Sequence, residues 1–228
     1  MSQPASAKPD STRGRLISFE GGEGGGKTVQ IKRLRDHFFS CGRDVVALRE
    51  PGGTTISEEI RNVVLSSKNI GIAYTTEVLL FQAARAQLYR EIVIPSLDSG
   101  KMVLMDRTRD SSVVYQGIVR GFGEELIEQL NDISTDKTFP DVTFLLDVDP
   151  EIGLERRRKE AESEGGKKMD RLDMEALDFH KKVRSAYLDV AKRDDRGRWV
   201  VVDASKSIEQ IEEAIWDEVM KRKLCDES

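Results

Sequence analysis

A run of glycines that ends in a lysine and a threonine is the first segment of this chain whose spacing suggests chemistry. Residues 21–28 read GGEGGGKT, which fits the phosphate-binding pattern G-x-x-x-x-G-K-S/T. Glycines let successive backbone N–H groups point into one concavity, and a helix that begins near Lys27 directs its positive end to the same point. The segment predicts that the phosphates of ATP are held by Gly21, Gly22, Glu23, Gly24, Gly25, Gly26, Lys27 and Thr28.

Lys27 and Thr28 have separate predicted roles in this loop. The ammonium group of Lys27 is expected to reach the β- and γ-phosphates, and the hydroxyl of Thr28 is expected to bind Mg²⁺. The alternative is a glycine-rich turn that binds nothing. An apolar run precedes the loop and an amphipathic pattern follows it, and this strand–loop–helix context favours the phosphate-binding interpretation.

Three more groups of polar residues follow predicted strands or lie on a predicted helix: Arg49, the pair Asp106-Arg107, and the arginines at 156–158. Phosphoryl transfer needs positioning and positive charge, so one lysine with several arginines fits two phosphorylated substrates that face each other. Asp106 is expected to organise magnesium or to cap a helix, and Arg107 to hold a phosphate or to form an ion pair. The arginine run belongs either to a mobile lid at about residues 155–172 or to a solvated helix face.

Phe81 and Arg85 lie one helical turn apart on the same face of a predicted helix. An arginine on an otherwise apolar stripe needs a partner. An aromatic ring and a guanidinium group at this spacing can clamp a planar base, although spacing alone favours packing in the core.

Predicted strands and helices alternate along the chain, which indicates an α/β fold with a parallel sheet and helices on both faces. Short apolar runs predict strands at residues 16–19, 44–48, 101–105, 142–146 and 199–202. Amphipathic patterns predict helices at residues 27–41, 55–65, 76–93, 111–120, 124–133, 150 into the arginine run, 173–193 and 207–223. Thr55 with Glu58 and Ser207 with Gln210 predict capping boxes, and Pro95 marks the expected end of the long helix.

The composition limits the classes of function. The 228 residues carry a formal net charge of −5, which argues against nucleic acid or a membrane surface as a partner, and no apolar run is long enough to span a bilayer. Two cysteines are too few for a disulfide framework, so a reducing compartment, the cytoplasm, is expected. Residues 1–14 are predicted to be a disordered tail, and residues 15–224 a single domain.

Several motifs together resemble those of the thymidylate kinase (dTMP kinase) family, with bacterial members most similar. The resemblance runs from about Leu16 to the C-terminal helix. It rests on residues 19–28, on Arg49-Glu50-Pro51-Gly52-Gly53-Thr54, on Glu77 to Phe81 with Arg85, and on Asp106-Arg107 with Ser111-Ser112 and Tyr115-Gln116-Gly117. Later segments add Gly153-Leu154 with Arg156, Asp170-Arg171, and Arg184 with Tyr187.

The resemblance implies the P-loop nucleoside monophosphate kinase fold with a five-stranded parallel sheet, a homodimer, and the conversion of ATP and dTMP to ADP and dTDP with magnesium. It implies that Arg49 and Arg107 hold the acceptor phosphate, that Phe81 stacks on thymine, and that Arg85 binds its edge. It further places Tyr115 and Glu23 at the sugar, and Ser112 and Gln116 in the base pocket. Arg156 and Arg158 would close over the transferring phosphoryl group, because Gly24 stands where some members carry an arginine.

The chain departs from the family pattern at three points. Val29 follows Thr28 where the family usually has threonine, Thr108 replaces an aromatic residue, and the predicted lid is longer than usual. Two other functions stay open from the sequence: a P-loop kinase for another small acceptor, and a nucleotide-binding regulatory module without turnover. An Asn-Lys-x-Asp segment, which a guanine-binding switch would carry, is absent from the sequence.

Overall fold

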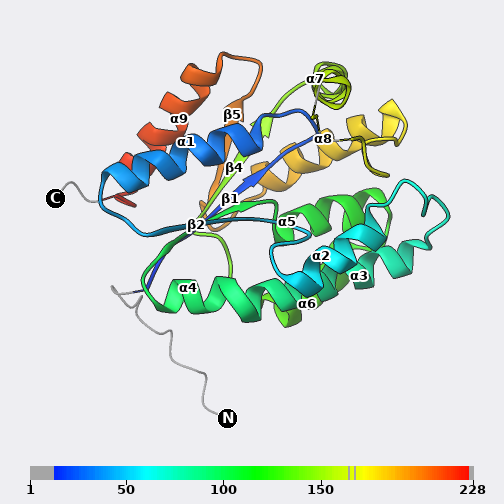
Figure 1. Ribbon diagram of the computed structural model, residues 1–228, viewed down its shortest axis with the longest axis horizontal. Helices are drawn as coiled ribbons and strands as arrows, with labels where there is room; N and C mark the ends of the chain where they lie inside the picture. The colour runs from blue at the N-terminus through cyan, green and yellow to red at the C-terminus, as the bar shows by residue number, and fades with distance from the viewer. Residues whose placement is uncertain (1–12, 164, 167, 226–228) are drawn as a thin grey trace, which may run out of the picture.

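A parallel sheet forms the centre of the protein in the computed structural model, which describes residues 13–163, 165–166 and 168–225 (Figure 1). Its strands are β1 (Leu16–Glu20), β2 (Val45–Arg49), β3 (Met102–Asp106), β4 (Val142–Asp147) and β5 (Trp199–Asp203). They are hydrogen-bonded in the order β2-β3-β1-β4-β5, and every pair is parallel, which confirms the predicted sheet. Because β1 lies between β3 and β4, the connections diverge at its carboxyl end and leave a crevice there.

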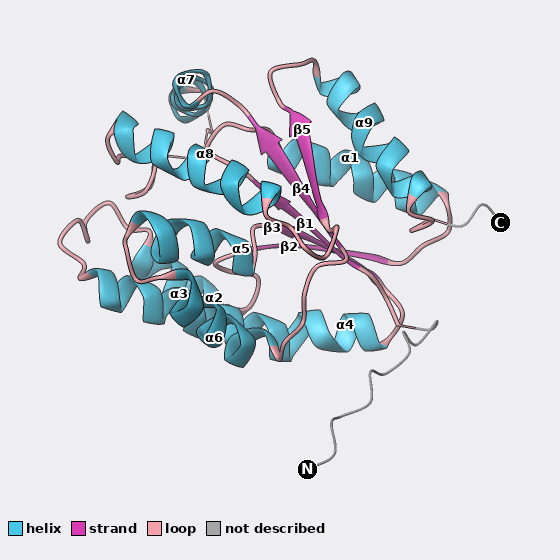
Figure 2. Cartoon of the chain, turned by 180° about the vertical axis from the view of Figure 1, so that it is seen from behind, coloured by secondary structure: helices cyan, strands magenta, loops and turns pink. Residues whose placement is uncertain are grey.

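Helices cover both faces of the sheet (Figure 2). Helices α1 (Lys27–Ser40) and α9 (Ile208–Lys221) pack together on one face, and α4 (Ile94–Asp98) and α8 (Leu177–Lys192) contact the other. Helix α3 (Tyr74–Leu88) packs between α2 (Thr55–Val64) and α6 (Glu124–Thr135), beside the short α5 (Arg109–Ser112). Helix α7 (Pro150–Glu162) follows β4 and packs against α8.

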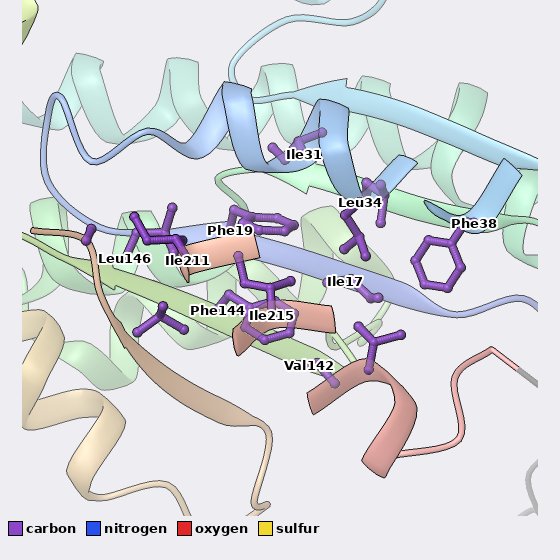
Figure 3. Packing of buried hydrophobic residues seen from close by; sticks show 14 of the residues in the cluster. Ile17, Phe19, Ile31, Leu34, Phe38, Val142, Phe144, Leu146, Ile211 and Ile215 are labelled. Atoms are coloured by element: carbon purple, nitrogen blue, oxygen red, sulfur yellow. The ribbon is translucent and has the colours of Figure 1, made fainter. Parts of the chain in front are cut away.

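The alternation of side chains along β1 and β4 divides the core in two. Ile17, Phe19 and Phe144 point toward α1 and α9, where they pack against Leu34 and Ile215 (Figure 3). The alternate positions, such as Leu16, face the other helical layer. None of the helices within the described part of the chain is long and apolar enough to cross a bilayer.

Replacing Phe144 with alanine is expected to destabilise the protein by about 3–5 kcal/mol, because its fully buried ring packs 5.4 Å from the ring of Phe19 and leaves a cavity when removed. Urea unfolding measures the change. Phe39→Ala is the matched control, because the Phe39 ring is 59% exposed. A loss below about 1 kcal/mol at Phe144 would contradict the packing described for this core.

The structure corrects several predicted helix ends. The long helix does not end near Pro95, because a π-helical segment, η1 (Tyr89–Val93), joins α3 to α4 and places Pro95 in the first turn of α4, where a missing N–H is tolerated. The helix predicted at 111–120 is α5 followed by a second π-helical segment, η2 (Val113–Val119). Helix α8 begins at Leu177 and not at 173, after a turn held by Asp170 and Asp173.

The predicted capping box at Thr55 is wrong, whereas the one at Ser207 is confirmed. Thr54 caps α2 instead, since its hydroxyl oxygen accepts a hydrogen bond from the backbone N–H of Ser57 at 3.1 Å. Glu58 turns away from the cap to bind Arg49 and the backbone N–H of Gly53.

The expected domain boundary is also shifted. The backbone N–H of Gly14 donates to the carbonyl of Leu97 at 2.7 Å, so Gly14 belongs to the folded domain and not to the tail. Residues 1–12 of the predicted tail lie outside the described residues, as do residues 164 and 167 of the predicted lid.

Candidate active site

A cavity of about 650 Å³ lies where the strands end. The glycine-rich loop after β1, the ends of β2 and β3, and parts of α3, η2 and α7 contribute to its wall. Most of the residues predicted from the sequence line it: Glu23, Gly24, Gly25, Gly26, Lys27, Thr28, Arg49, Phe81, Arg85, Asp106, Arg107, Ser112, Tyr115, Gln116 and Arg156. Gly21, Gly22 and Arg158 lie outside the wall.

The glycine-rich loop has the backbone geometry that an anion site needs. Gly26 adopts a left-handed conformation with φ 82° immediately before α1, and no side chain caps the first N–H groups of that helix. The Nζ atom of Lys27 donates to the carbonyls of Gly22 at 2.8 Å and Gly21 at 3.3 Å. These acceptors are neutral, so an anionic phosphate would compete well for the ammonium group.

Gly24 brings the loop into backbone contact with α7. It has φ 65°, and a Cβ atom on it would lie 2.0 Å from the carbonyl oxygen of Gly153 in α7. A Cβ on Gly153 would in turn meet the carbonyl oxygen of Glu23 at 2.2 Å. A larger residue at position 24 would therefore force the loop and α7 apart, which accounts for the glycine at this position.

Thr28 and Asp106 form an oxygen-rich pair at the mouth of the loop. The Thr28 hydroxyl donates to Oδ2 of Asp106 at 3.0 Å, and Asp106 is the last residue of β3. Hydroxyl and carboxylate oxygens are the ligands that Mg²⁺ prefers, and this ion usually takes only one or two protein ligands beside phosphates and water. The pair fits such an ion, and the described residues contain no group of three or more His, Cys, Asp or Glu side chains arranged to hold a metal.

Arg107 lines the cavity and is held by several side chains. Its Nη2 donates to Oε1 of Glu23 at 2.6 Å, and its Nη1 donates to Ser111 Oγ at 3.3 Å and to Tyr187 Oη at 3.2 Å. Burial acting alone would raise the pKa of Glu23, but the charges of Arg107 and Lys27 outweigh it and lower the pKa to about 2. Arg107 thus forms the ion pair that the sequence offered as an alternative role, and its side chain also lines the cavity.

Arg85 is buried in the cavity wall and donates to acceptors from several segments of the chain. Its Nε donates to Glu50 at 2.7 Å, its Nη1 to Ser112 and Asn131 at 2.9 Å each, and its Nη2 to the carbonyl of Thr108 at 3.0 Å. Four of its five N–H groups are therefore used, and the fifth has no partner among the described residues. Burial raises the pKa of Glu50 to about 7, although the charge of Arg85 opposes this rise.

Phe81 and Gln116 also line the cavity. Phe81 is half-buried and belongs to the cavity wall, so core packing, which the spacing favoured, is not its role. The Nε2 group of Gln116 donates to Oε1 of Glu77 at 2.9 Å. The Phe81 ring therefore belongs to the same cavity as the Arg85 N–H that has no partner among the described residues.

The three arginines of the predicted lid, at positions 156–158, differ from one another in their surroundings. Nη1 of Arg156 donates to the carbonyl of Ala204 at 3.0 Å at the edge of the cavity. Arg157 is buried and binds Asp173, whereas Arg158 is exposed. Because successive residues of a helix are rotated by about 100°, only Arg156 and Arg157 reach the cavity.

Several cavity or supporting residues were missed from the sequence. Arg61 of α2 lines the cavity and donates to the carbonyl of Pro51 at 2.6 Å, but nothing in the pattern of α2 distinguishes it from a solvated arginine. Glu20, Glu50, Ser111 and Tyr187 lie within the motifs that carry the resemblance, yet no role was predicted for them.

Comparisons with known proteins agree with this geometry. A family model described as thymidylate kinase matches residues 19–215. The thymidylate kinase of Pelobacter propionicus is 44% identical over 211 residues, which cover 92% of this chain and 96% of that protein. The thymidylate kinase of a Geobacillus species is 46% identical over 199 residues, which cover 87% and 92% respectively.

A solved structure shares the fold. The crystal structure of thymidylate kinase from Ehrlichia chaffeensis aligns with a TM-score of 0.73 at 30% identity, covering 91% of this chain and 99% of that one. The family match and these alignments span most of the chain, including the glycine-rich loop and the strands that surround the cavity. The chain therefore belongs to the thymidylate kinase family.

Proposed function

We propose that this protein transfers the γ-phosphoryl group of ATP to dTMP, giving ADP and dTDP. One observation supports this most directly: the glycine-rich loop at Lys27, the pair Phe81 and Arg85, and Arg107 all line one cavity. Two nucleotides bound in this cavity would bring their phosphates together beside Lys27 and Arg107. The protein then contributes alignment and positive charge, which is what this reaction needs.

The acceptor end has features suited to a thymine deoxynucleotide. Arg85 is only a donor, so its free N–H favours a carbonyl oxygen on the base edge, as in thymine, over the amino group of cytosine. The Tyr115 hydroxyl donates to Oε1 of Glu23 at 3.2 Å, and the two residues together limit the room for the sugar. We infer that Phe81 stacks on the base, that Ser112 and Gln116 border it, and that Arg49 and Arg107 hold its phosphate.

Three further features belong to this proposal. Magnesium held by Thr28 and Asp106 would supply charge neutralisation for the ATP phosphates. A homodimer is expected, and exposed apolar side chains on neighbouring helices, Val63 of α2, Leu79 of α3 and Ile133 of α6, offer a surface for a second copy. A cytoplasmic location is expected for an enzyme of nucleotide synthesis with this family membership.

An acceptor panel tests the function. ADP release is measured with ATP, Mg²⁺ and each of dTMP, dUMP, dCMP, dGMP and AMP, and kcat/KM is expected to be highest with dTMP. If kcat/KM is higher with another nucleotide, that nucleotide is the substrate and the proposal of dTMP is wrong. Absence of turnover with all five acceptors, together with ATP-dependent capture of a protein, would favour a regulatory module.

Arg85 is expected to control base recognition without affecting ATP. The double variant Arg85→Met with Glu50→Gln removes the guanidinium without leaving its buried partner charged and unpaired. We expect KM for dTMP to rise by at least about 10-fold while KM for ATP stays unchanged. Glu50→Gln alone is the control. Equal rises for both nucleotides would show that Arg85 supports the fold and not the base.

A further inference from the structure

We propose that Glu20 is a positioning residue for Arg107. It holds the backbone conformation of Arg107 through Thr108, and it holds the orientation of the guanidinium group through Ser111 and Tyr187. The inference rests on the proposed role of Arg107 at the dTMP phosphate. Glu20 is fully buried at the end of β1, and it lies outside the cavity wall. It therefore acts on the substrate only through its neighbours.

The position of Glu20 follows from the alternation of β1. Leu16, Ser18 and Glu20 occupy the face opposite to Ile17 and Phe19, which pack under α1 and α9. Glu20 consequently faces the layer that contains α5 and α8. A carboxyl group buried in this layer must be satisfied by hydrogen bonds, and its donors are Ser111 of α5, Tyr187 of α8 and the backbone N–H of Thr108 just before α5.

One oxygen of Glu20 orients two hydroxyl groups. Oε2 accepts hydrogen bonds from Ser111 Oγ at 2.6 Å and from Tyr187 Oη at 2.7 Å. Each hydroxyl has one hydrogen, and in the proposed arrangement both hydrogens point to Oε2, although the two hydroxyl oxygens also lie 2.9 Å from each other. Their lone pairs are thereby left for Nη1 of Arg107, which donates to both oxygens. Oε2 of Glu20 thus sets the direction of two hydrogen bonds that anchor the arginine.

The other oxygen of Glu20 fixes the turn that carries Arg107. Arg107 has φ 69°, a left-handed conformation that is unfavourable for a residue with a side chain. Oε1 of Glu20 accepts from the backbone N–H of Thr108 at 2.8 Å, which holds the peptide that follows the strained residue. The backbone N–H of Arg107 is itself held by the carbonyl of Phe19 at 3.0 Å.

This anchoring leaves one edge of Arg107 for the substrate. Both N–H groups of Nη1 are occupied by Ser111 and Tyr187, and one N–H of Nη2 is paired with Glu23. Nε and the second N–H of Nη2 have no partner among the described residues. These two groups lie on the same edge of the guanidinium plane, so they can bind a phosphate through two parallel hydrogen bonds.

The test compares ligands with and without the phosphate. Isothermal titration calorimetry measures Kd for dTMP, thymidine and ATP with the wild-type enzyme, Tyr187→Phe, Ser111→Ala and Glu20→Gln. Tyr187→Phe removes one oxygen and keeps the ring, so it stays informative if Glu20→Gln fails to fold. We expect each folded variant to weaken dTMP binding by about 10-fold and to leave Kd for thymidine and ATP unchanged. Tyr74→Phe, whose residue is half exposed, is the matched control.

A double-mutant cycle separates positioning from a general structural effect. In an Arg107→Ala background, Tyr187→Phe is expected to have no further effect on Kd for dTMP, because the residue it orients is gone. An unchanged Kd for dTMP in the single variant, equal weakening of thymidine and dTMP, or full additivity in the cycle would each overturn the inference. If the wild-type enzyme does not bind dTMP, the proposed function itself fails, and this inference with it.

Discussion

Replacing Lys27 with alanine is expected to lower kcat by about 10³-fold, which corresponds to roughly 4 kcal/mol of lost transition-state stabilisation. Lys27 is the first residue of α1 and is buried in the cavity wall. Within the described part of the chain, its Nζ donates to the carbonyls of Gly21 and Gly22 alone. In the reaction this ammonium group would neutralise charge that develops between the β- and γ-phosphates. Steady-state ADP release with ATP and dTMP measures the change.

The control for Lys27 lies on the same helix. Lys32 of α1 is exposed and does not line the cavity, so Lys32→Ala is expected to keep wild-type kcat. Kd for dTMP is expected to be little changed in Lys27→Ala, since the residues proposed to bind dTMP do not include Lys27. A Lys27→Ala enzyme that retains kcat within about 10-fold of wild type would show that the loop binds phosphate without taking part in the transfer.

The fold could be predicted because two periodicities are plain in the sequence. Apolar runs such as 142–146 and amphipathic segments such as 27–41 give the order of elements and therefore the parallel sheet. Each strand was predicted to end one residue too early, however. The structure extends them to Glu20, Arg49, Asp106, Asp147 and Asp203. All five residues are polar, and Arg49 and Asp106 line the cavity, so a search for apolar runs stops before them although the backbone pairing continues.

The sequence predicts which residues belong to the site better than it predicts their contacts. A glycine pattern and the motifs around Arg107 identify which residues reach the cavity, since strand ends meet at one sheet edge. The contacts of Arg85 depend on Glu50, Ser112, Thr108 and Asn131, which come from three different parts of the chain. No spacing rule brings these groups together, so the partner that Arg85 required was expected but was not identified.

Pro95 shows how a local rule fails for a physical reason. Proline normally ends a helix because it lacks the N–H that donates to the preceding turn. Here the π-helical segment Tyr89–Val93 changes the hydrogen-bond register just before it, and Pro95 becomes a first-turn residue of α4. The register change depends on tertiary packing, since Tyr89 and Val93 are fully buried against the sheet.

Replacing Arg156 with alanine is expected to lower kcat by about 10³-fold while Kd for dTMP stays unchanged, because an arginine beside a transferring phosphoryl group contributes about 10³–10⁵-fold in comparable enzymes. Arg156 lies one helical turn after Gly153, where the backbone of α7 touches the glycine-rich loop at Gly24. Its guanidinium is bound to the neutral carbonyl of Ala204, from which an anionic phosphate would release it readily. Single-turnover kinetics with saturating dTMP isolate this effect from binding.

The chain supplies a matched control two residues away. The family resemblance implies the same role for Arg156 and Arg158. Both are exposed, but Arg158 is rotated by about 200° around α7 from Arg156 and does not line the cavity. Arg158→Ala is therefore expected to turn over like the wild-type enzyme. If the two variants lose activity equally, α7 must rotate or unwind during the reaction to bring both guanidinium groups to the phosphates. If neither loses activity, the positive charge at the transferring group comes from Lys27 and Arg107 alone.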